Sequence, residues 1–595
     1  MREFSAPPAV TVPDDARLTD VVFDHAASDP DLVSFSRRRG GRWVDVTAAD
    51  FAAEVTGVAK GLLAAGIGAG DRVAVMSATR YEWTLLDYAI WTAGAISVPI
   101  YETSSAEQVR WTLGDSGAVA AVVETAAHAA IVASVAGDLP KLHHVWTIDS
   151  GGVAALTTGG TDVADREVEQ RRRAVRLDDL ATIIYTSGTT GRPKGCELTQ
   201  RNLLTEVMTA VGGLPPLFRP GAATLLFLPI AHVLGRVIQC GAIYAKVRLG
   251  HTADVKNLLE DLREFRPTFI LAVPRVFEKV YNTAKQRAHI EGKGRIFDVA
   301  ERVAVRYSQA LDDDRVPVML DLQHRVFDRL VYSRLRAALG GQCTAAISGG
   351  APLGARLGHF FRGIGLPVFE GYGLTESTAA CCLNLEGAVK IGTVGRPIPG
   401  VSIRIAGDGE ILLKGDVISD RYWQNDEATE QSRTDGWFRT GDIGDLDDDG
   451  FLRITGRKKE LIVTAGGKNV APAALEDRLR AHPLISQCMV VGDNRPYIAA
   501  LITLDPDALP AWRDSHGKPA DSTAGSLRDD PDLNTEIQRA VDQANAAVSR
   551  AEGIRRFRIV PDDFTVESGE LTPSLKLKRT VVLERHDDDM VELYG

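Results

Sequence analysis

Short apolar runs alternate with amphipathic stretches over the first 350 residues or so. From Asp50 to Gly66 the sequence DFAAEVTGVAKGLLAAG places apolar residues at helical intervals and ends on glycine, which predicts a capped amphipathic helix. Residues 71–77 and 95–101 are expected to be strands, with a helix around 83–93 between them. Further strands are expected at 117–124, 181–185, 223–229, 268–274 and 343–350. This alternation predicts a parallel sheet covered by helices.

The pattern changes after Gly395, where alternating strands and Asp-Gly turns predict a small β subdomain. Beyond residue 457 an α/β pattern resumes, with a helix at 472–482 and strands within 487–504. Residues 507–532 are polar and rich in Asp, Ser, Gly and Pro, so a loop is expected there. A last amphipathic helix is expected to carry one apolar stripe of Leu533, Ile537, Val541, Ala544 and Val548.

A chain of 595 residues is too long for one compact core. The predicted fold class is therefore α/β, with a large N-terminal domain of helix-covered, mostly parallel sheets and a small β subdomain, followed by a smaller α/β C-terminal domain. We place the boundary between residues 1–458 and 459–595.

Composition and charge narrow the class of protein. The net charge of −11 and the lack of a long basic stripe argue against a nucleic-acid partner. Six cysteines without a C-x-x-C pair, and an N-terminus without an apolar signal core, predict reduced thiols and a cytoplasmic protein. No apolar run approaches the roughly 20 residues that span a bilayer. The protein is thus expected to be soluble, or at most peripheral to a membrane; its oligomeric state is left open.

The stretch YTSGTTGRPKG, residues 185–195, follows an apolar β-branched run and contains little that could continue a buried strand. Glycines and small hydroxyls allow backbone N–H groups to approach phosphate oxygens, and Lys194 adds a positive charge. The kinase-type loop G-x-x-x-x-G-K-[ST] is not matched, because no Gly-Lys-Ser/Thr stands at the required spacing. A polar surface loop without a ligand is the alternative, and context must decide between the two.

That context is a series of further motifs: FLPIAHVLGR (227–236), AVPRVFEKVY (272–281), SGGAPL (348–353), EGYGLTE (370–376), WFRTGD (437–442), GRKKELIVTAGGKNV (456–470) and LTPSLKLKR (571–579). Together with YTSGTTGRPKG they resemble the signatures of the adenylate-forming superfamily, which comprises acyl-CoA synthetases, adenylation domains of peptide synthetases and luciferases. The resemblance covers essentially the whole chain, and its wording is most similar to that of the long-chain fatty acid CoA ligases.

The resemblance implies a two-step reaction that uses ATP, Mg²⁺ and CoA. A fatty acid carboxylate attacks the α-phosphate of ATP to give acyl-AMP and pyrophosphate, and the CoA thiol then displaces AMP. In this scheme the C-terminal domain is a mobile lid that rotates between the steps about a hinge at Lys459.

The resemblance also assigns roles to particular residues. Lys576 is implied as the catalytic lysine, Thr375 as a contact to the α-phosphate, and Glu376 with Thr189 as the Mg²⁺ ligands. Tyr372 is expected to stack on adenine, and Asp442 and Arg457 to bind the ribose or the phosphate. The remaining implied nucleotide or CoA contacts are Thr186, Ser187, Gly188, Thr190, Gly191, Lys194, Gly349, Gly350, Ala351, Glu370, Gly371, Gly373, Gly466 and Gly467.

Three positions leave questions open. His232 lies in the segment that forms one wall of the acyl pocket in relatives, and a structural histidine is as good an interpretation as a catalytic one. Arg236 falls near the place where some long-chain members carry a tryptophan gate. Neither the gating mechanism nor the chain-length preference can therefore be predicted from the sequence. Leu575 stands where a glycine commonly precedes the catalytic lysine.

Two other functions are also compatible with the sequence. One is a fatty acyl-AMP ligase that delivers its product to an acyl carrier protein. The other is a fatty-acid-binding protein without turnover, against which the set Lys194, Glu376, Asp442, Arg457 and Lys576 argues.

Overall fold

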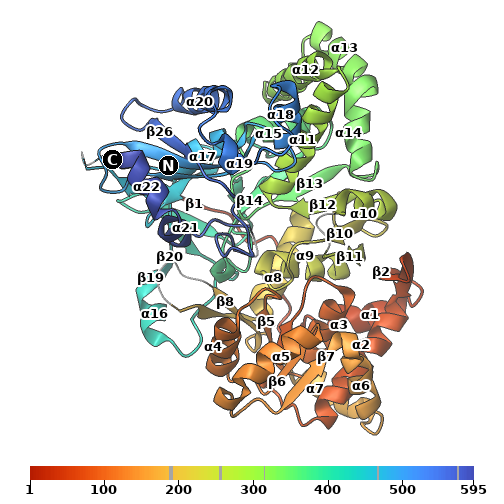
Figure 1. Ribbon diagram of the computed structural model, residues 1–595. Coiled ribbons are helices and arrows are strands. Elements are labelled where there is room, and N and C mark those ends of the chain that lie inside the picture. The colour runs from red at the N-terminus through yellow and green to blue at the C-terminus, as the bar shows by residue number, and fades with distance from the viewer. Residues whose placement is uncertain (187–191, 254–256, 314, 466–467, 573–574) are drawn as a thin grey trace.

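The computed structural model describes residues 1–186, 192–253, 257–313, 315–465, 468–572 and 575–595. Figure 1 shows the N-terminus at the left, near β1; the chain then forms a helix-covered sheet at the lower end and a second sheet above it. A group of helices projects at the upper end, and the C-terminal residues form a separate body beside that group. The predicted α/β fold class is confirmed.

The first sheet is almost entirely parallel. Its order is β7 (His144–Thr147), β6 (Ala120–Val123), β4 (Arg72–Met76), β5 (Ile96–Ile100), β8 (Leu180–Thr186) and β9 (Lys194–Thr199). Only β9 runs antiparallel to its neighbour among the described strands, so β8 and β9 form a hairpin at one edge.

The second sheet has a parallel centre and antiparallel edges. Its order is β16 (Arg396–Pro397), β15 (Cys382–Leu383), β14 (Val368–Tyr372), β13 (Ala345–Ser348), β12 (Phe269–Ala272), β10 (Ala223–Leu226), β11 (Arg248–His251), β2 (Val33–Arg39) and β3 (Arg42–Thr47). The strands from β14 to β2 are parallel, so their carboxyl ends share one edge, where open α/β sheets bind ligands.

The remaining sheets are smaller. The β subdomain is an antiparallel sheet of β1 (Glu3–Ser5), β17 (Ser402–Ile405), β18 (Glu410–Lys414), β20 (Trp437–Leu446) and β19 (Arg433–Thr434), with β21 (Leu452–Arg457) also paired to β20. The C-terminal domain contains the pair β22 (Ile462–Val463) and β23 (Asn469–Val470), and the sheet β24 (Ile485–Val491), β25 (Ile498–Leu504) and β26 (Ile554–Ile559).

Helices cover these sheets. In the first 250 residues they are α1 (Asp20–Ser28), α2 (Ala48–Ala64), α3 (Tyr81–Thr92), α4 (Ala106–Ser116), α5 (Ala126–Val135), η1 (Ala136–Asp138), η2 (Ile148–Ser150), α6 (Gly152–Gly159), α7 (Asp165–Ala174), α8 (Gln200–Gly213) and α9 (Val233–Tyr244). Those that follow are α10 (Leu258–Phe265), α11 (Pro274–Ile290), α12 (Gly294–Asp312), α13 (Val318–Phe327), η3 (Asp328–Tyr332), α14 (Ser333–Ala338), α15 (Ala355–Gly363), η4 (Thr375–Ser377) and α16 (Asp426–Gln431). The C-terminal domain adds α17 (Pro472–Arg480), α18 (Leu509–Ser515), α19 (Ala524–Leu527), α20 (Pro531–Asn545), α21 (Arg579–Arg585) and α22 (Asp587–Tyr594).

Local chemistry sets several helix ends. Thr47 caps α2 through a reciprocal pair of hydrogen bonds with Asp50, and the helix gives way to Gly66 at φ +82°. Thr199 and Asn202 make the same capping box at the start of α8. The apolar faces of α2, α3, α8 and α9 share one continuous core with both large sheets, whereas the C-terminal domain has cores of its own.

The expectation of a loop over residues 507–532 is wrong. The segment contains α18 and α19, because Leu509, Trp512 and Leu527 are buried against the core of the C-terminal domain. Polar residues far outnumber these three in the segment, so its overall composition is that of a loop.

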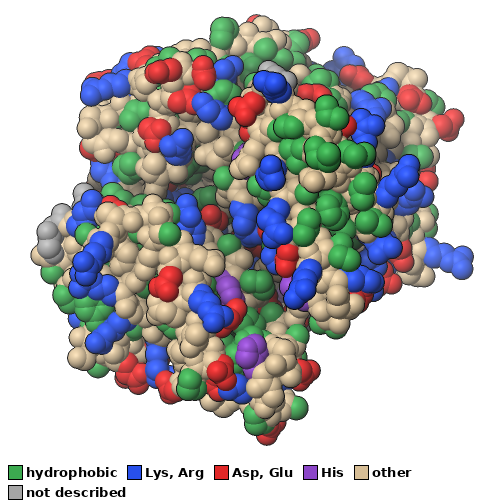
Figure 2. Space-filling view, turned by 90° about the horizontal axis from the view of Figure 1, so that it is seen from above, with side chains coloured by type: hydrophobic (Ala, Val, Ile, Leu, Met, Phe, Trp, Pro, Cys, Tyr) green, Lys and Arg blue, Asp and Glu red, His purple; other side chains and the backbone are tan. Residues whose placement is uncertain are grey.

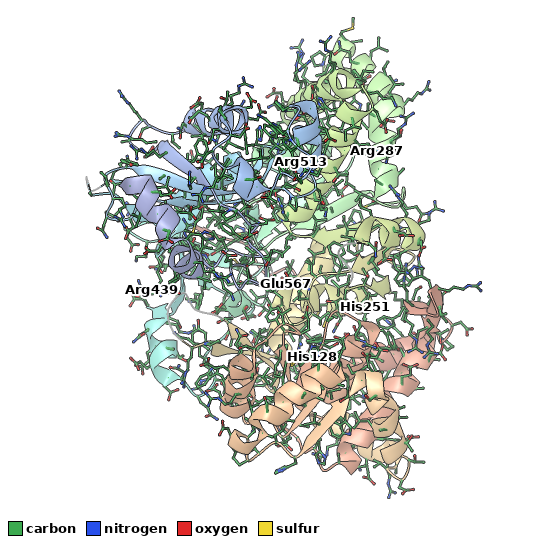
Figure 3. All side chains as sticks on the ribbon, in the orientation of Figure 1. His128, His251, Arg287, Arg439, Arg513 and Glu567 are labelled. Atoms are coloured by element: carbon green, nitrogen blue, oxygen red, sulfur yellow. The ribbon has the colours of Figure 1, made fainter. Side chains whose placement is uncertain are left out.

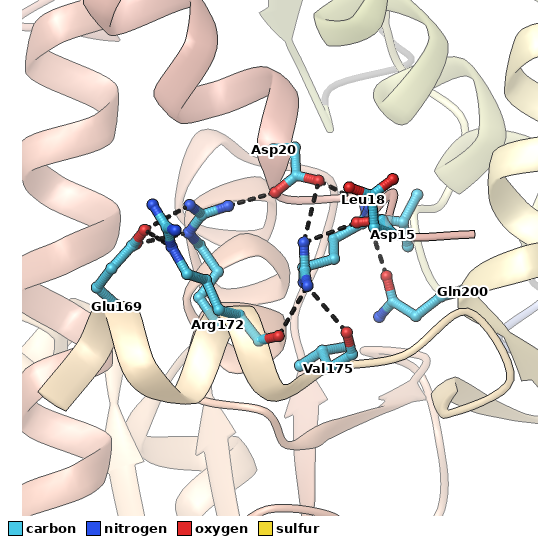
Figure 4. Close-up of polar contacts among 9 residues, drawn as sticks. Asp15, Leu18, Asp20, Glu169, Arg172, Val175 and Gln200 are labelled. Carbon is cyan, nitrogen blue, oxygen red and sulfur yellow. Dashed lines mark hydrogen bonds and ion pairs between the residues drawn. The ribbon is translucent and has the colours of Figure 1, made fainter. Parts of the chain in front are cut away.

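The basic run at residues 171–176 has a structural role. Arg172 of α7 forms ion pairs with Asp20 and Glu169, and the Arg17 guanidinium donates to the carbonyl of Val175 at 3.1 Å (Figure 4). These contacts fasten α1 and the segment before it to α7.

Three features of the described residues bear on the class of protein. All six cysteines are buried and free. Within the described residues, no helix is long and apolar enough to cross a membrane. The same residues contain no cluster of three or more histidine, cysteine or acidic side chains that could hold a metal ion.

Candidate active site

The paired strands β8 and β9 flank the predicted phosphate-binding stretch. Thr186 and Lys194 face each other at the end of the two strands, and the Thr186 hydroxyl donates to the carbonyl of Lys194 at 3.5 Å. The expected contacts Ser187, Gly188, Thr189, Thr190 and Gly191 lie outside the described residues. The pairing of β8 with β9 thus brings Thr186 and Lys194 together.

Glu376 lies next to this hairpin. Its carboxylate oxygen Oε1 accepts a hydrogen bond of 2.7 Å from the hydroxyl of Tyr422, and the ammonium of Lys194 lies 5.3 Å from the centre of the Tyr422 ring. A backbone bridge between Cys196 and Tyr422 holds the tyrosine against β9. The ring therefore connects the predicted phosphate lysine with the predicted metal ligand.

The Glu376 carboxylate also fits the requirements of Mg²⁺. Magnesium prefers hard oxygen ligands and keeps several of its waters, so one carboxylate together with substrate phosphates is a common site. The Tyr422 hydroxyl donates a hydrogen bond to Oε1 of Glu376, and no described residue makes a hydrogen bond to Oε2 of that carboxylate. The second predicted ligand, Thr189, lies outside the described residues.

Asp442 is buried and held by two partners. Its Oδ2 accepts a 2.6 Å hydrogen bond from the Tyr372 hydroxyl, and its Oδ1 lies 3.1 Å from Nε of Arg457, the residue opposite it on β21. Burial raises the pKa of Asp442, while the Arg457 guanidinium and the Tyr372 hydrogen bond oppose that rise. The three predicted adenosine contacts therefore form one connected group.

The SGGAPL and EGYGLTE motifs end neighbouring parallel strands, β13 and β14. Gly350 adopts φ +84°, which favours glycine, and a Cβ on Gly373 would lie 1.5 Å from the carbonyl oxygen of Ala379. Glu370 accepts a 2.9 Å hydrogen bond from the backbone N–H of Leu353. Burial raises the pKa of Glu370 to about 7. Glu370 thus braces the turn that carries Gly349, Gly350 and Ala351.

Lys576 reaches this group from the C-terminal domain. Burial, and then the Arg457 guanidinium, lower its pKa, while the carboxylates of Asp442 and Glu376 oppose the shift. The Thr572 N–H donates to the Lys576 carbonyl at 2.7 Å. Leu575, directly before the lysine, has φ +60°, the left-handed region in which a glycine would be unstrained.

His232 makes a structural contact through one ring nitrogen and leaves the other available for chemistry. It precedes α9, and its Nδ1 accepts a hydrogen bond of 3.2 Å from the backbone N–H of Leu234. Burial, assisted by the nearby Lys576 ammonium, lowers the pKa of His232 to about 3. The imidazole is therefore neutral at physiological pH, with its proton on Nε2.

Arg236, one turn further along α9, is completely buried. Its Nη2 lies 3.4 Å from Oδ1 of Asp87, and its Nη1 donates to the hydroxyls of Ser97 at 3.2 Å and Thr182 at 3.1 Å. A buried Gln239 amide donates to the other oxygen of Asp87 at 3.2 Å.

The same buried cluster extends to the second sheet. The Thr84 hydroxyl on α3 contacts the Gln239 side chain at 2.8 Å and Nε2 of His251 on β11 at 2.9 Å. His251 is labelled in Figure 3. Polar side chains from both large sheets and from α3 and α9 thus form one connected buried network that includes Arg236.

Sequence reasoning missed Tyr422 and Asp87. Tyr422 stands in a segment, ISDRYWQND, without a recognisable pattern of its own, and Asp87 is one polar residue within a buried helix. A charged residue in an otherwise apolar run was the available signal for Asp87. No local signal identifies Tyr422, because its partners come from distant parts of the chain.

Comparison with known proteins gives the class to which this arrangement belongs. Residues 22–423 match the AMP-binding enzyme family, and residues 459–595 match the AMP-binding enzyme C-terminal domain. The chain is a member of the AMP-binding enzyme family.

Among named relatives, the long-chain-fatty-acid–CoA ligase FadD15 of Mycobacterium tuberculosis is 55% identical over 598 residues and covers the whole of both chains. The long-chain-fatty-acid–CoA ligase ACSBG1 of Rattus norvegicus is 30% identical over 613 residues, with 95% of this chain and 83% of the relative covered.

Solved structures share the fold at lower identity. The A domain of carboxylic acid reductase from Segniliparus rugosus, in complex with AMP and a co-purified carboxylic acid, superimposes with a TM-score of 0.75 at 20% identity, covering 97% of this chain and 94% of that one. The anthranilate CoA ligase AuaEII, in complex with anthranoyl-AMP, gives a TM-score of 0.71 at 19% identity, covering 96% and 98%.

Proposed function

We propose that the protein is a long-chain fatty acid CoA ligase. It activates a fatty acid with ATP to acyl-AMP and pyrophosphate, and then transfers the acyl group to the thiol of CoA. The observation that carries the proposal is the grouping of Lys576 from the C-terminal domain with Asp442 and Glu376 from the N-terminal domain. Full-length similarity to relatives named as long-chain-fatty-acid–CoA ligases supports the choice of substrate class.

In the first step two anions must meet, so charge neutralisation and alignment dominate catalysis. Lys194 and residues 187–191 bind the β- and γ-phosphates, and Asp442 accepts hydrogen bonds from the ribose hydroxyls. The Lys576 ammonium neutralises charge as the carboxylate oxygen forms its bond to the α-phosphorus and the bond to pyrophosphate breaks. The neutral His232 offers its Nε2–H as a donor to an oxygen of the acid or the adenylate.

Glu376, with Thr189, is the proposed Mg²⁺ site, and the ion supplies charge neutralisation to the phosphates when bound. Lys459 stands in an exposed turn directly after β21, a position at which a few backbone dihedrals can rotate a domain. Rotation about it withdraws Lys576 and turns the segment around Gly466 and Gly467 towards the acyl-AMP, where the CoA thiol enters. Those two glycines lie outside the described residues.

The test is a product assay on purified protein with ATP, Mg²⁺, CoA and acids of increasing length. We expect CoA thioesters, with the highest kcat/KM for acids of about 12–18 carbons, because each buried CH₂ contributes about 0.8 kcal/mol. A clear preference for acetate or an aromatic acid would contradict the assignment of a long-chain substrate.

Two further outcomes separate the rival functions. Release of acyl-AMP without CoA thioester, together with transfer to an acyl carrier protein, would identify an acyl-AMP ligase. Absence of exchange between labelled pyrophosphate and ATP in the presence of a fatty acid would identify a binding protein without turnover.

Long-chain acids dissolve in bilayers, so the proposed function also includes peripheral contact with a membrane.

A further inference from the structure

The helices at the upper end of the molecule expose an unusual amount of apolar side chain. Of the sixteen large hydrophobic residues that are exposed in the described part of the chain, nine fall between residues 290 and 330. They belong to α11, α12, α13 and η3. Figure 2 looks onto this end of the molecule and shows hydrophobic side chains gathered among Lys and Arg side chains. Monomeric soluble proteins rarely expose such a cluster without a partner.

The helix α13 is apolar on its outward face. Val318, Met319, Leu322 and Val326 are 87%, 66%, 56% and 49% exposed, and their spacing of i, i+1, i+4 and i+8 places them on one face. The opposite face carries Leu320, which is buried.

That opposite face already packs against the rest of the domain. His324 stacks on the ring of Tyr307 of α12 with 3.8 Å between centroids and contacts the carbonyl of Gly363 at 2.6 Å. The helix therefore does not need its outward apolar face in order to hold its place in the fold.

The neighbouring helix α12 adds positive charge. Arg295, Val299, Arg302 and Arg306 follow each other at i, i+4, i+7 and i+11, which puts them on one stripe, and all four are exposed. No described carboxylate forms an ion pair with any of these three arginines. Arg287, labelled in Figure 3, marks the same helical group at the end of α11.

The acidic residues of the region are mostly occupied by other partners. Asp321 pairs with Arg325 at 2.8 Å, Asp328 with Arg336 at 2.7 Å, and Asp312 with Arg362 at 2.7 Å. Glu301 is bound to Lys285 at 2.9 Å. Residues 287–336 contain ten Lys and Arg against eight Asp and Glu, a net charge of +2 in a chain of −11. The surface is therefore locally opposite in sign to the protein as a whole.

We propose that the surface formed by α12 and the outward face of α13 docks on a membrane leaflet that contains anionic lipids. Exposed apolar side chains bordered by free arginines are the composition of helices that lie in the interface of a bilayer. The apolar residues enter the boundary between headgroups and acyl chains, and Arg295, Arg302 and Arg306 bind lipid phosphates.

A second copy of this chain is a poorer occupant, because a two-fold contact would bring like-charged arginine stripes together. The proposal that this surface docks on a membrane rests on the exposed side chains alone. Its use, to collect a long-chain acid from the leaflet in which the acid is dissolved, rests on the proposed function.

The experiment is vesicle flotation of the full-length protein with phosphatidylcholine vesicles, with and without phosphatidylglycerol. We expect binding only to the anionic vesicles, and weaker binding at high salt. Each arginine near an anionic surface changes the partition coefficient about fivefold, so the triple variant R295Q/R302Q/R306Q should bind about a hundredfold less. The apolar variant L322D/V326D should also lose binding. The control variant V591D alters an apolar residue that is 63% exposed on α22 and should bind like the wild type.

Several results would overturn the proposal. The first is that the wild-type protein does not bind anionic vesicles. The second is that neither the arginine variant nor the apolar variant reduces binding. The third is that the apolar variant changes only the oligomeric state, from dimer to monomer. A protein partner that competes for this surface while vesicles do not bind would also overturn it.

Turnover distinguishes this failure from failure of the proposed function. With a short, soluble fatty acid and no vesicles, the variants should form acyl-CoA at the wild-type rate, and only turnover of vesicle-embedded acid should fall. Wild-type protein that makes no acyl-CoA under either condition would refute the proposed function and leave the vesicle-binding result to be judged separately.

Discussion

Replacing Arg236 with methionine tests whether this residue is a structural ion-pair partner or a gate. Both Arg236 and Asp87 have fully buried side chains, so solvent does not screen their interaction. Methionine fills similar space but removes the donors to Ser97 and Thr182 and leaves the Asp87 carboxylate without its cation. Breaking a buried pair from one side costs about 3–5 kcal/mol, because an uncompensated charge remains. We expect R236M to lose about that much free energy of unfolding.

The loss should depend on pH. Burial already raises the pKa of Asp87, and the Arg236 guanidinium opposes that rise, so in R236M the pKa should rise further. A folded-state pKa above the unfolded value means that the native protein binds more protons, so its stability falls as the pH rises from the unfolded pKa of about 3.9 towards the native pKa. The defect of R236M is therefore expected to be smaller in mildly acidic buffer than at neutral pH.

The assay is urea unfolding followed by tryptophan fluorescence, since Trp83 and Trp91 are buried in the helix that carries Asp87. The double variant D87N/R236M should be more stable than R236M, because it removes the unpaired charge. Stability of R236M within about 1 kcal/mol of the wild type, or a double variant that loses the sum of both single losses, would refute the reasoning. A changed chain-length preference without any loss of stability would instead identify Arg236 as a gate.

Three further predictions concern the site and its supports. Lys576→Ala should slow acyl-AMP formation by about 10²–10³ while leaving thioester formation from supplied acyl-AMP nearly unchanged; equal loss in both half-reactions would contradict domain rotation. Tyr422→Phe removes a hydrogen bond to the Glu376 carboxylate worth about 1.5 kcal/mol or more, so adenylation should slow about tenfold and the Mg²⁺ requirement should change; an unaltered Mg²⁺ titration and rate would count against it. Burial raises the pKa of Glu206 well above its ordinary 4.5, so the wild type loses stability as the pH rises above that value; Glu206→Gln should flatten this dependence, and parallel urea midpoints against pH would disprove the shift.

The sequence was sufficient to predict most of the fold. The run at residues 71–77 and the helix around 83–93 were predicted from periodicity, and β4 and α3 lie there within two residues. Periodicity works for these elements because burial on one face or both leaves a regular apolar pattern. It failed over residues 507–532, where a few buried apolar residues such as Trp512 anchor short helices within a polar segment.

The residues of the candidate site were likewise predicted only in part. Glu376, Asp442 and Lys576 stand in motifs that could be recognised along the chain, and the structure brings them together; their chemical roles stay predictions. Tyr422 could not be predicted, because its hydrogen bond to Glu376 depends on a bridge to Cys196 on a distant hairpin. For His232 the sequence left a structural and a catalytic role open, and the structure places Nδ1 on the start of α9 while leaving Nε2 for chemistry.

The pairing of β1 with β17 has a consequence for how the protein is made. Glu3–Ser5 bind to Ser402–Ile405, and the Ser5 hydroxyl donates to that of Ser402 across 397 residues. At roughly 5–20 residues per second, the ribosome releases the partner strand about 20–80 s after β1. Until then β1 remains an unpaired strand on the nascent chain, while the helix-covered sheets behind it can already pack. The β subdomain is therefore the last part of the N-terminal domain to close, and a chain that terminates before residue 402 leaves β1 as a free edge for chaperones or for aggregation.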